Sequence, residues 1–533
     1  MARAAARYPT SRPEPAAAEQ DPDSWIAAVE QACCLLAADA PPRDWRAIGL
    51  SAMIPTLVTA DAAGDPVGPA ITWEDSRANE HAERLRDAYG ASAGRPGGDA
   101  LYQVTGQWLD GRYLLPMFLR LRDAEPDRAA ATRSLLGAKD YLFGWLTGQA
   151  ATDPSTATGT GAYSLRAGGW DAGILSAAAS AGGHPPALPA AHTPPTQPAA
   201  HTPPAPPAAH TPPAPPAAHT PPAQPAAHTP PAPPAAPTLP GLPPVLPSST
   251  VMPLRAEVAS TLGCRGVPVC LGAADSVLGA LGLGARSPGQ AAYIAGTSTV
   301  ILGVAAEPHL DQAHRFLVTP MAETGLWGRE MDLLATGSAL RWLAGLLGAD
   351  RAGAGLDEPG VLALAGEVEP AHAPVVLPYL SPGEQGALWD PALTGTVTGL
   401  TLGHDRRHLA RGLVNGIILE SRRCLAVLEE GQDPGAPPAD LLVAGGSAAA
   451  ASFRGDLADA TGRRVIMPAE RSTDFSALGA ALLAAHAVGR PLRVGSVPSA
   501  GDAEVSKPDP ARAAAWDRLW AEHERARRAI RGD

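Results

Sequence analysis

Cysteine and lysine are both scarce in this chain of 533 residues. The five cysteines, at positions 33, 34, 264, 270 and 424, form no Cys-x-x-Cys pair and no even framework in a short chain. That spacing argues against structural zinc and against a disulfide-stapled secreted fold, so we expect reduced cysteines. Lysine occurs only at Lys139 and Lys507, against a large excess of arginine, which is typical of a GC-rich genome.

Long apolar runs and basic stretches are lacking as well. No segment approaches the ~20 apolar residues that cross a bilayer, and the N-terminal MARAAARYPTSRPEP has no apolar signal-peptide region. We therefore expect no membrane partner and a cytoplasmic location. The formal net charge is −12 and no basic stripe is interleaved with aromatics. Because an acidic surface repels phosphate backbones, we expect no nucleic-acid partner.

The overall composition indicates a folded chain of two or more domains. Apolar residues make up 45% and charged residues 18% of the sequence, which is enough for sizeable cores at this length. Apolar strand-like segments alternate with helical ones, as in AIGLSAM, VVLPYL and LLVAGG. This alternation predicts α/β layers.

The segment Val267 to Val304 carries the clearest chemical signal. VPVCLGA reads as a buried strand with Asp275 at its C-terminal end, and SVLGALGLGA continues as a small-residue helix. QAAYIAG is a second strand that turns at Gly296, Thr297 and Ser298. Glycine and hydroxyl groups in a turn suit phosphate oxygens. Alone, each piece also fits a helix cap or a strand turn, but together they favour phosphoryl transfer.

At this point the sequence resembles the FGGY family of carbohydrate kinases, most closely its xylulokinase-like branch. In that family GxxD before a small-residue helix supplies the catalytic Asp, and GTS supplies a phosphate loop. Further blocks follow in the family's order over almost all of the non-repetitive chain: Arg7 to Trp25, Ile71 to Leu85, Leu135 to Asp171, Gly395 to Ile417 and Leu441 to Pro468.

The resemblance implies an α/β fold of two actin-like (ribonuclease H-like) domains around a central cleft. We expect an N-terminal sugar-binding domain over 1–284, a C-terminal nucleotide-binding domain over 285–490 and a helical tail over 491–533. A Pro/Ala/His-rich repeat at 184–247 should interrupt the first domain. Its prolines remove backbone donors and no apolar face recurs, so we expect a disordered, polyproline-like spacer whose histidines are incidental.

The same resemblance implies the chemistry of the site. Asp275 would be the general base and a Mg²⁺ ligand. We expect an ordinary aspartate pKa of roughly 3.9, which keeps this carboxylate ionised at neutral pH. Gly296, Thr297 and Ser298 would hold phosphate oxygens of ATP, with Mg²⁺ offsetting the developing charge. Gly445 and Gly446, in LLVAGG, would let the backbone lie against adenine or ribose, although a plain helix-entry turn is the alternative.

Two residues are candidates for sugar binding. Asp75, in WEDSR, matches a family position that faces sugar hydroxyls, with a surface pair to Arg77 or Arg84 as the alternative. Met53 lies in SAMIPTLV, where xylulokinases have a Gln-Met-His sugar contact. We expect a small sugar, such as the pentulose xylulose, with related pentuloses, polyols and gluconate-like acids left open. The resemblance also leaves a homodimer open.

The family's opening D-x-G-T hairpin has no counterpart near the start of this chain. We expect either a misplaced start codon or a real loss of one phosphate loop and a central strand. On this interpretation the chain as printed aggregates readily and turns over little ATP. A sugar- or partner-binding pseudokinase is therefore the competing hypothesis.

Lys139 is one of only two lysines in a chain that otherwise uses arginine. It lies in GAKDYLFGWLTG, whose apolar spacing predicts a helix with one buried face. A solvated lysine whose stem covers that face and a specific structural or ligand contact are both compatible with the pattern. We leave Lys139 outside the catalytic set.

Overall fold

The computed structural model describes residues 2–181, 239–348, 355–381, 386–390, 393–430, 438–468, 474–491 and 503–531. The expected insertion at 184–247 therefore lies outside the described residues up to position 238. Its last residues are described: Gly241 and Val245 form isolated bridges to Ser134 and Thr152, and Leu242 packs against the N-terminal core. This part of the segment belongs to the folded N-terminal half.

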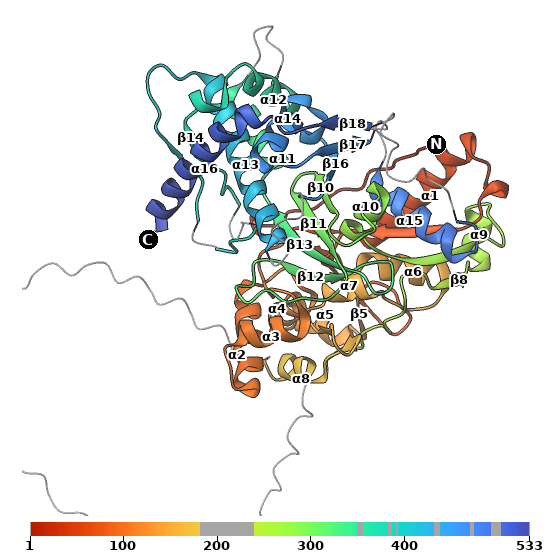
Figure 1. The fold of residues 1–533 in the computed structure, drawn as a ribbon. Coiled ribbons are helices and arrows are strands. Elements are labelled where there is room, and N and C mark those ends of the chain that lie inside the picture. The colour runs from red at the N-terminus through yellow and green to blue at the C-terminus, as the bar shows by residue number, and fades with distance from the viewer. Residues whose placement is uncertain are drawn as a thin grey trace, which may run out of the picture.

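The N-terminal half contains two main sheets and a group of helices that lies at the bottom of Figure 1. One sheet has the order β1-β4-β3-β5, and the other has the order β2-β9-β8. The strands are β1 (Glu19–Gln20), β2 (Ile48–Ala52), β3 (Thr56–Ala60), β4 (Ala70–Thr72), β5 (Ser134–Leu136), β6 (Tyr163–Ser164), β7 (Gly169–Trp170), β8 (Val251–Pro253) and β9 (Pro268–Ala274). The helices are α1 (Pro22–Asp39), α2 (Asn79–Ala93), α3 (Gly97–Thr105), α4 (Leu114–Ala124), α5 (Pro126–Ala131), α6 (Ala138–Thr147), α7 (Pro154–Thr158), α8 (Ala172–Ser180), α9 (Ala256–Thr261) and α10 (Asp275–Leu283), with the short 3₁₀ turn η1 (Pro42–Asp44).

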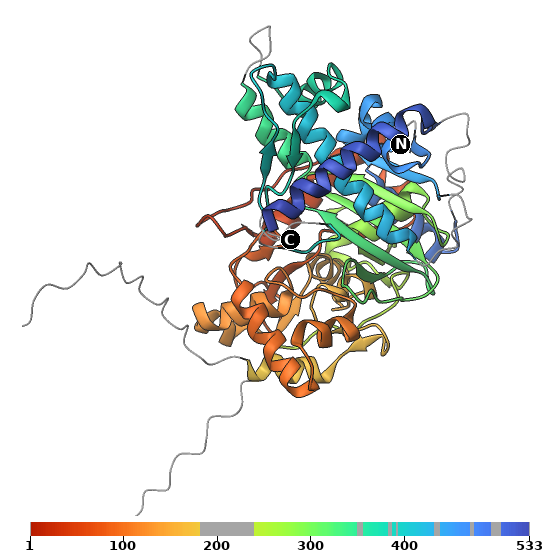
Figure 2. The same cartoon turned by 60° about the vertical axis from the view of Figure 1, so that its left-hand side comes forward.

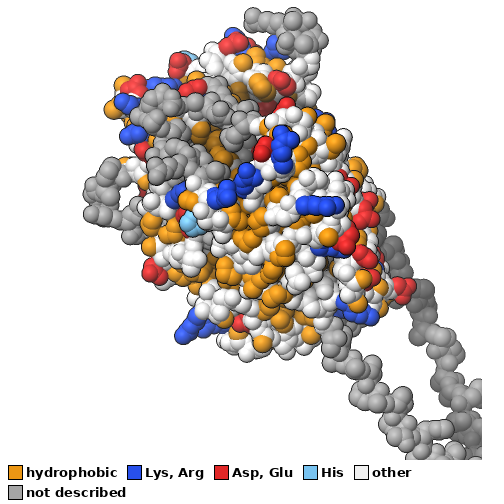
Figure 3. Space-filling model, turned by 90° about the vertical axis from the view of Figure 1, so that its right-hand side faces the viewer, with side chains coloured by type: hydrophobic (Ala, Val, Ile, Leu, Met, Phe, Trp, Pro, Cys, Tyr) orange, Lys and Arg blue, Asp and Glu red, His pale blue; other side chains and the backbone are white. Residues whose placement is uncertain are grey.

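Strand β2 lies at the edge of its sheet, parallel to β9. All five of its residues are half-buried, although the sequence IGLSA is mostly apolar. The face of the molecule that carries α1, α9 and α15 shows apolar side chains gathered across its middle (Figure 3). Strand β2 is therefore only partly covered at this edge of its sheet.

The C-terminal half is built on one seven-stranded sheet with the order β12-β13-β11-β10-β16-β17-β18. Its strands are β10 (Ala291–Ala295), β11 (Thr299–Ala305), β12 (Leu317–Pro320), β13 (Trp327–Leu333), β16 (Leu441–Gly445), β17 (Val465–Pro468) and β18 (Ala503–Ser506). Strands β10, β16 and β17 run parallel, and the remaining pairs are antiparallel. The parallel strands are apolar and buried on both faces, as is usual for such strands.

Helices cover this sheet, and the last of them crosses the C-terminal half diagonally in Figure 2. The elements are α11 (Gly337–Leu347), α12 (Glu358–Gly366), α13 (Arg406–Glu429), α14 (Ala451–Thr461), α15 (Phe475–Ala487), α16 (Pro510–Arg531), the hairpin of β14 (Val375–Leu377) and β15 (Thr396–Thr398), and the turns η2 (Pro370–His372) and η3 (Ser447–Ala449). The described part of the expected C-terminal tail comprises β18 and α16. It is integrated into the domain, because β18 pairs with β17 and Trp516 and His523 are both 1% exposed.

Helices α10 and α15 join the two halves. A Cβ atom on Gly479 would lie 1.9 Å from the carbonyl oxygen of Leu278, and one on Gly282 would lie 2.0 Å from that of Phe475. The helices therefore touch backbone to backbone, which only small residues permit. Helix α10 follows β9 directly and leads into β10 of the C-terminal sheet. The close contact between α10 and α15 therefore fixes the position of the first residue of α10.

Candidate active site

Asp275 is the first residue of α10 and follows directly on β9. Its Oδ1 accepts a hydrogen bond from the backbone N–H of Ser276 at 3.0 Å, and its carbonyl oxygen accepts one from Ser476 Oγ at 2.9 Å. The strand, the helix and the position of the carboxylate between them thus agree with the sequence analysis. The carboxylate is positioned by elements from both halves of the chain.

A cavity of about 160 Å³ opens beside Asp275. The N-terminal half contributes an apolar wall that includes Met53, Ile54 and Pro55, and the C-terminal half contributes Glu330 and Asp332. Met53 therefore lies where the sequence analysis expected a sugar contact. The same half also contributes hydrogen-bonding side chains to the lining, among them Gln107, Tyr113 and Thr158.

Glu330 and Asp332 were not found by sequence reasoning. They occupy alternate positions of β13 and so share one face of the strand, while Met331 and Leu333 point into the core. Thr319 Oγ1 donates to Glu330 at 3.1 Å, whereas the buried Oδ1 of Asp332 has no hydrogen-bond partner among the described residues. The alternation of polar and apolar residues in WGREMDL was the available signal. It does not tell what the polar face of this strand lies against in the folded protein.

Burial shifts all three cavity carboxyls in the same direction. It raises the pKa of Asp275 to about 7, and the charges of Asp332 and Asp474 add to the rise while the Ser276 N–H opposes it. Burial likewise raises the pKa of Glu330 to about 8 and that of Asp332 to about 6, where Arg112 acts against the rise. The ordinary pKa expected for Asp275 was therefore wrong: the group is about half-ionised near neutral pH.

Arg112 is the cation at this cavity. Its Nε and Nη2 donate to Asp110 Oδ2 at 2.9 Å and 2.6 Å, in a two-pronged pair. Burial lowers the pKa of Arg112, but Asp110 outweighs this effect and the net direction is upward. Because Asp110 already compensates the charge of Arg112, this arginine is not available to neutralise the three carboxyl groups of the cavity.

Asp75 lines a larger neighbouring cavity of about 650 Å³, together with Trp73 and Arg112. Its carboxylate is 2% exposed and is already occupied. It accepts from the N–H of Ala18 at 3.0 Å and from Arg77 Nη2 at 2.7 Å. This is the Arg77 pairing that the sequence analysis gave as the alternative, here in a buried setting. Both oxygens serve the fold, so we do not include Asp75 among the sugar ligands.

The two glycine-containing loops meet at one edge of the C-terminal sheet. Gly296, Thr297 and Ser298 join β10 to β11, and parallel pairing of β10 with β16 sets Ala295 beside Gly445. Gly445 has a φ of +102°, and a Cβ there would lie 1.9 Å from the Ala295 carbonyl oxygen. Gly446 N–H donates to that same oxygen at 2.9 Å. The five residues expected to hold nucleotide are thus brought together.

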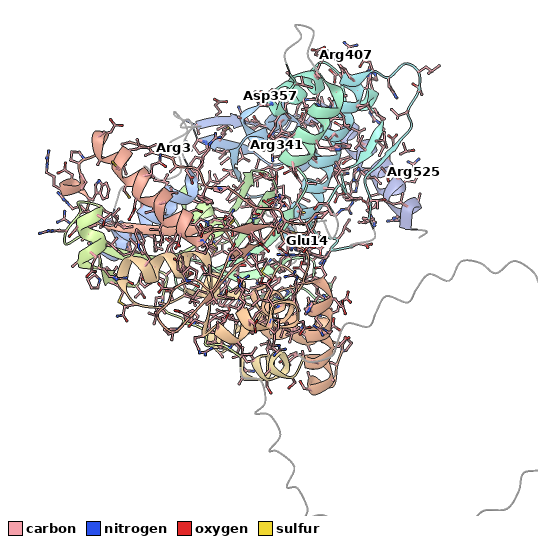
Figure 4. The ribbon with its side chains drawn as sticks, turned by 180° about the vertical axis from the view of Figure 1, so that it is seen from behind. Arg3, Glu14, Arg341, Asp357, Arg407 and Arg525 are labelled. Atoms are coloured by element: carbon pink, nitrogen blue, oxygen red, sulfur yellow. The ribbon has the colours of Figure 1, made fainter. Side chains whose placement is uncertain are left out.

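Helix α11 adds two features that sequence reasoning missed. Its first turn approaches the same edge, where the Ser338 N–H donates to the Thr297 carbonyl at 2.9 Å. Arg341 Nη2 donates to Thr297 Oγ1 at 3.1 Å, and Arg341 also lies 3.4 Å from Glu358 at the start of α12. Figure 4 shows Arg341 near Asp357, the cap of α12. A helix start beside glycine turns favours anions.

The described part of the chain contains no group of three or more His, Cys, Asp or Glu side chains arranged to hold a metal ion. No helix within the described ranges is long and apolar enough to span a bilayer.

The chain belongs to the FGGY family of carbohydrate kinases. The model of the family's N-terminal domain matches residues 1–194, and that of its C-terminal domain matches residues 291–488. The fold is accordingly the two-domain actin-like architecture that the sequence analysis expected, with the cavity beside Asp275 between the halves.

Relatives within this family are kinases of several small substrates. The chain is 25% identical to a gluconokinase of Bacillus licheniformis over 91% of this chain and 82% of the relative. It is 26% identical to a xylulose kinase of Escherichia coli K12 over 85% of this chain and 79% of the relative. Among solved structures, a xylulose kinase of Rhodospirillum rubrum matches with a TM-score of 0.75 at 26% identity, covering 98% of this chain and 93% of that one.

We predict that Asp275→Asn raises the melting temperature at pH 8. The folded-state pKa of Asp275, about 7, lies above the unfolded value of about 3.9, so the folded state binds the proton more tightly. Stability therefore falls as pH rises between these two values. Asparagine stays neutral and escapes that loss, so the variant should melt a few degrees higher at pH 8, with the difference vanishing near pH 4.

The matched control is Asp87→Asn, which removes an exposed carboxylate from the surface of α2. Its melting temperature should follow that of the unmodified protein at both pH values. If Asp275→Asn melts below the unmodified protein at pH 8, the carboxyl is not desolvated as described.

Proposed function

We propose that the protein is an ATP-dependent sugar kinase that transfers the γ-phosphate of ATP to a hydroxyl group of a small neutral sugar, such as the pentulose xylulose. The observation that carries the proposal is the half-buried carboxyl group of Asp275, whose pKa is raised to about 7, at a cavity between the two halves and close to the joint that links them. Membership of the carbohydrate kinase family supports the reaction class.

In the proposed reaction Asp275 acts as the general base. The attacking sugar hydroxyl loses its proton to the Asp275 carboxylate as its oxygen forms the bond to phosphorus, and the bond to the ADP leaving oxygen breaks. A base with a pKa near the working pH combines a sizeable ionised fraction with a useful proton affinity. The value of about 7 for Asp275 meets this requirement.

We assign the phosphates of ATP to the loop between β10 and β11, which consists of Gly296, Thr297 and Ser298. We assign the nucleoside to Gly445 and Gly446. A Cβ at Gly445 would collide with Ala295 and one at Gly446 would lie 2.8 Å from Glu358, so both glycines let the two loops pack closely together. The assignment is supported by the backbone groups and hydroxyls that these loops place at one end of the sheet, which suit phosphate oxygens. Mg²⁺ typically uses one or two carboxylates together with substrate phosphates, and Asp275 is the carboxylate we assign to it. When bound, the ion would offset negative charge on the transferring phosphate.

The lining of the cavity argues for a neutral sugar over a sugar acid. Of the three carboxyls that face it, Asp332 with a pKa of about 6 is mostly ionised at neutral pH and Asp275 with a pKa of about 7 is about half-ionised, while Arg112 is already paired with Asp110. A like-charge pair about 4 Å apart costs about 4 kcal/mol at an effective dielectric of about 20. This exceeds the ~1.4 kcal/mol that corresponds to a tenfold preference. Neutral hydrogen-bonding side chains that also line the cavity, among them Gln107, Tyr113 and Thr158, suit the hydroxyl groups of a neutral sugar.

The relatives compared are kinases, and no observation favours the alternative of a non-catalytic sugar- or partner-binding protein. We therefore do not pursue that alternative.

We predict that Asp275→Asn lowers kcat by at least ~10²-fold while nucleotide affinity stays nearly unchanged. Removing a general base raises the barrier of the chemical step without touching the glycine loops. Steady-state kinetics with coupled ADP release and calorimetric titration with ATP measure the two quantities. Near-normal turnover would refute the role of Asp275, and loss of nucleotide binding alone would reassign it to Mg²⁺ ligation. Asp87→Asn again serves as the control.

A second prediction concerns substrate class. In a panel of xylulose, ribulose, ribitol, glycerol and gluconate, we expect a neutral compound to be the best substrate and gluconate to have a kcat/KM at least ~10-fold lower. Asp332→Asn should narrow that gap because it removes one repelling charge. Gluconate as the best substrate of the unmodified protein would contradict the charge argument without affecting the assignment of Asp275.

A further inference from the structure

Lys139 is buried in the N-terminal half, and the reaction proposed above makes no use of it. Its side chain is 1% exposed, in the first turn of α6. An isolated ammonium group at such depth is costly, so a buried lysine requires partners. The solvated surface lysine that the sequence pattern also allowed is therefore excluded.

Two aspartates surround the ammonium group. Lys139 Nζ lies 3.0 Å from Asp140 Oδ1 and 3.2 Å from Asp153 Oδ1. The aspartates are 3% and 0% exposed. Burial lowers the pKa of Lys139, but the two carboxylates outweigh it and the net direction is upward, so the lysine stays charged.

Asp153 also accepts hydrogen bonds from three hydroxyl groups, which lead towards the active site. Ser155 Oγ donates at 2.5 Å, Thr156 Oγ1 at 2.6 Å and Ser248 Oγ at 3.1 Å. Ser155 Oγ, having donated its hydrogen to Asp153, accepts the backbone N–H of Ala274 at 2.9 Å. Ala274 is the residue immediately before Asp275.

A second branch reaches the same strand two residues earlier. The carbonyl oxygen of Ser248 accepts the N–H of Gly272 at 3.0 Å. Gly272 has a φ of +76°, and the pairing of β9 with β2 shifts register around this point. Such an irregularity re-aims the residues that follow it. The backbone at Gly272 and at Ala274 is thus held by two serines, Ser248 and Ser155, that are both hydrogen-bonded to Asp153.

We propose that Lys139 and Asp153 are positioning residues for catalysis: their buried ion pair holds Ser155 and Ser248, which fix the bent end of β9 and so aim the Asp275 carboxylate at the sugar hydroxyl. The inference rests on the proposed role of Asp275 as general base. It also gives a role to one of the chain's two lysines.

The sharpest test compares Ser155→Ala with Thr156→Val. Each variant removes one hydroxyl bonded to Asp153 and keeps the ion pair with Lys139, but only Ser155 continues to Ala274. We expect Ser155→Ala to lower kcat about tenfold, with the KM values for sugar and ATP within twofold of normal. Both variants should lower the melting temperature by a similar few degrees, but Thr156→Val should keep kcat within twofold of that of the unmodified protein.

A merely structural role would change the melting temperatures of both variants and the kcat of neither or of both, and that result would overturn the proposal. Because Ser155 also lines the cavity, a raised sugar KM at unchanged kcat would assign it to substrate contact and would likewise overturn it.

Lys139→Met supplies the second measurement. If it folds, its kcat should fall by a factor like that of Ser155→Ala, and the double variant should be no worse than the lower single variant, because both act along one path. Additive losses in the double variant would contradict the proposal. If Lys139→Met does not fold, the pair Ser155→Ala and Thr156→Val decides alone. The proposed function fails separately, when Asp275→Asn retains turnover.

Discussion

The carboxyl group of Asp275 is half-buried at the junction of the two halves, beside a cavity, and the other features of the site follow from that partial burial. Burial raises its pKa to about 7, which suits a base at neutral pH but makes its ionised form unfavourable in the folded state. The rigid surroundings offset this cost: the end of a buried strand on one side and the backbone-to-backbone contact of α10 with α15 on the other.

Local sequence signals predicted the parts of the site that are built from single segments. The strand before Asp275, the small-residue helix after it and the turn at Gly296 each have a pattern that is complete within about ten residues. The resemblance to a family then indicated that these pieces and Gly445 belong together. The parallel pairing of Ala295 with Gly445 is the physical reason that they do.

What the sequence could not predict depends on contacts between distant segments. Glu330 and Asp332 alternate with core residues, but only the packing of β13 tells that they face Asp275's cavity. The pKa of Asp275 could not be read from its neighbours in sequence, because burial is a property of the assembled halves. Likewise, the spacing around Lys139 left its role open until Asp153 was found beside it.

The central claim, that Asp275 with a pKa raised by burial is the base of a sugar kinase, is tested most directly by the pH dependence of kcat/KM for Mg·ATP at saturating sugar, a quantity that reports the enzyme form without bound metal or nucleotide. The account predicts that the logarithm of kcat/KM rises with unit slope up to an apparent pKa near 7 and then levels, since only the ionised carboxylate of Asp275 accepts the proton. A profile that stays flat down to pH 5 would contradict it.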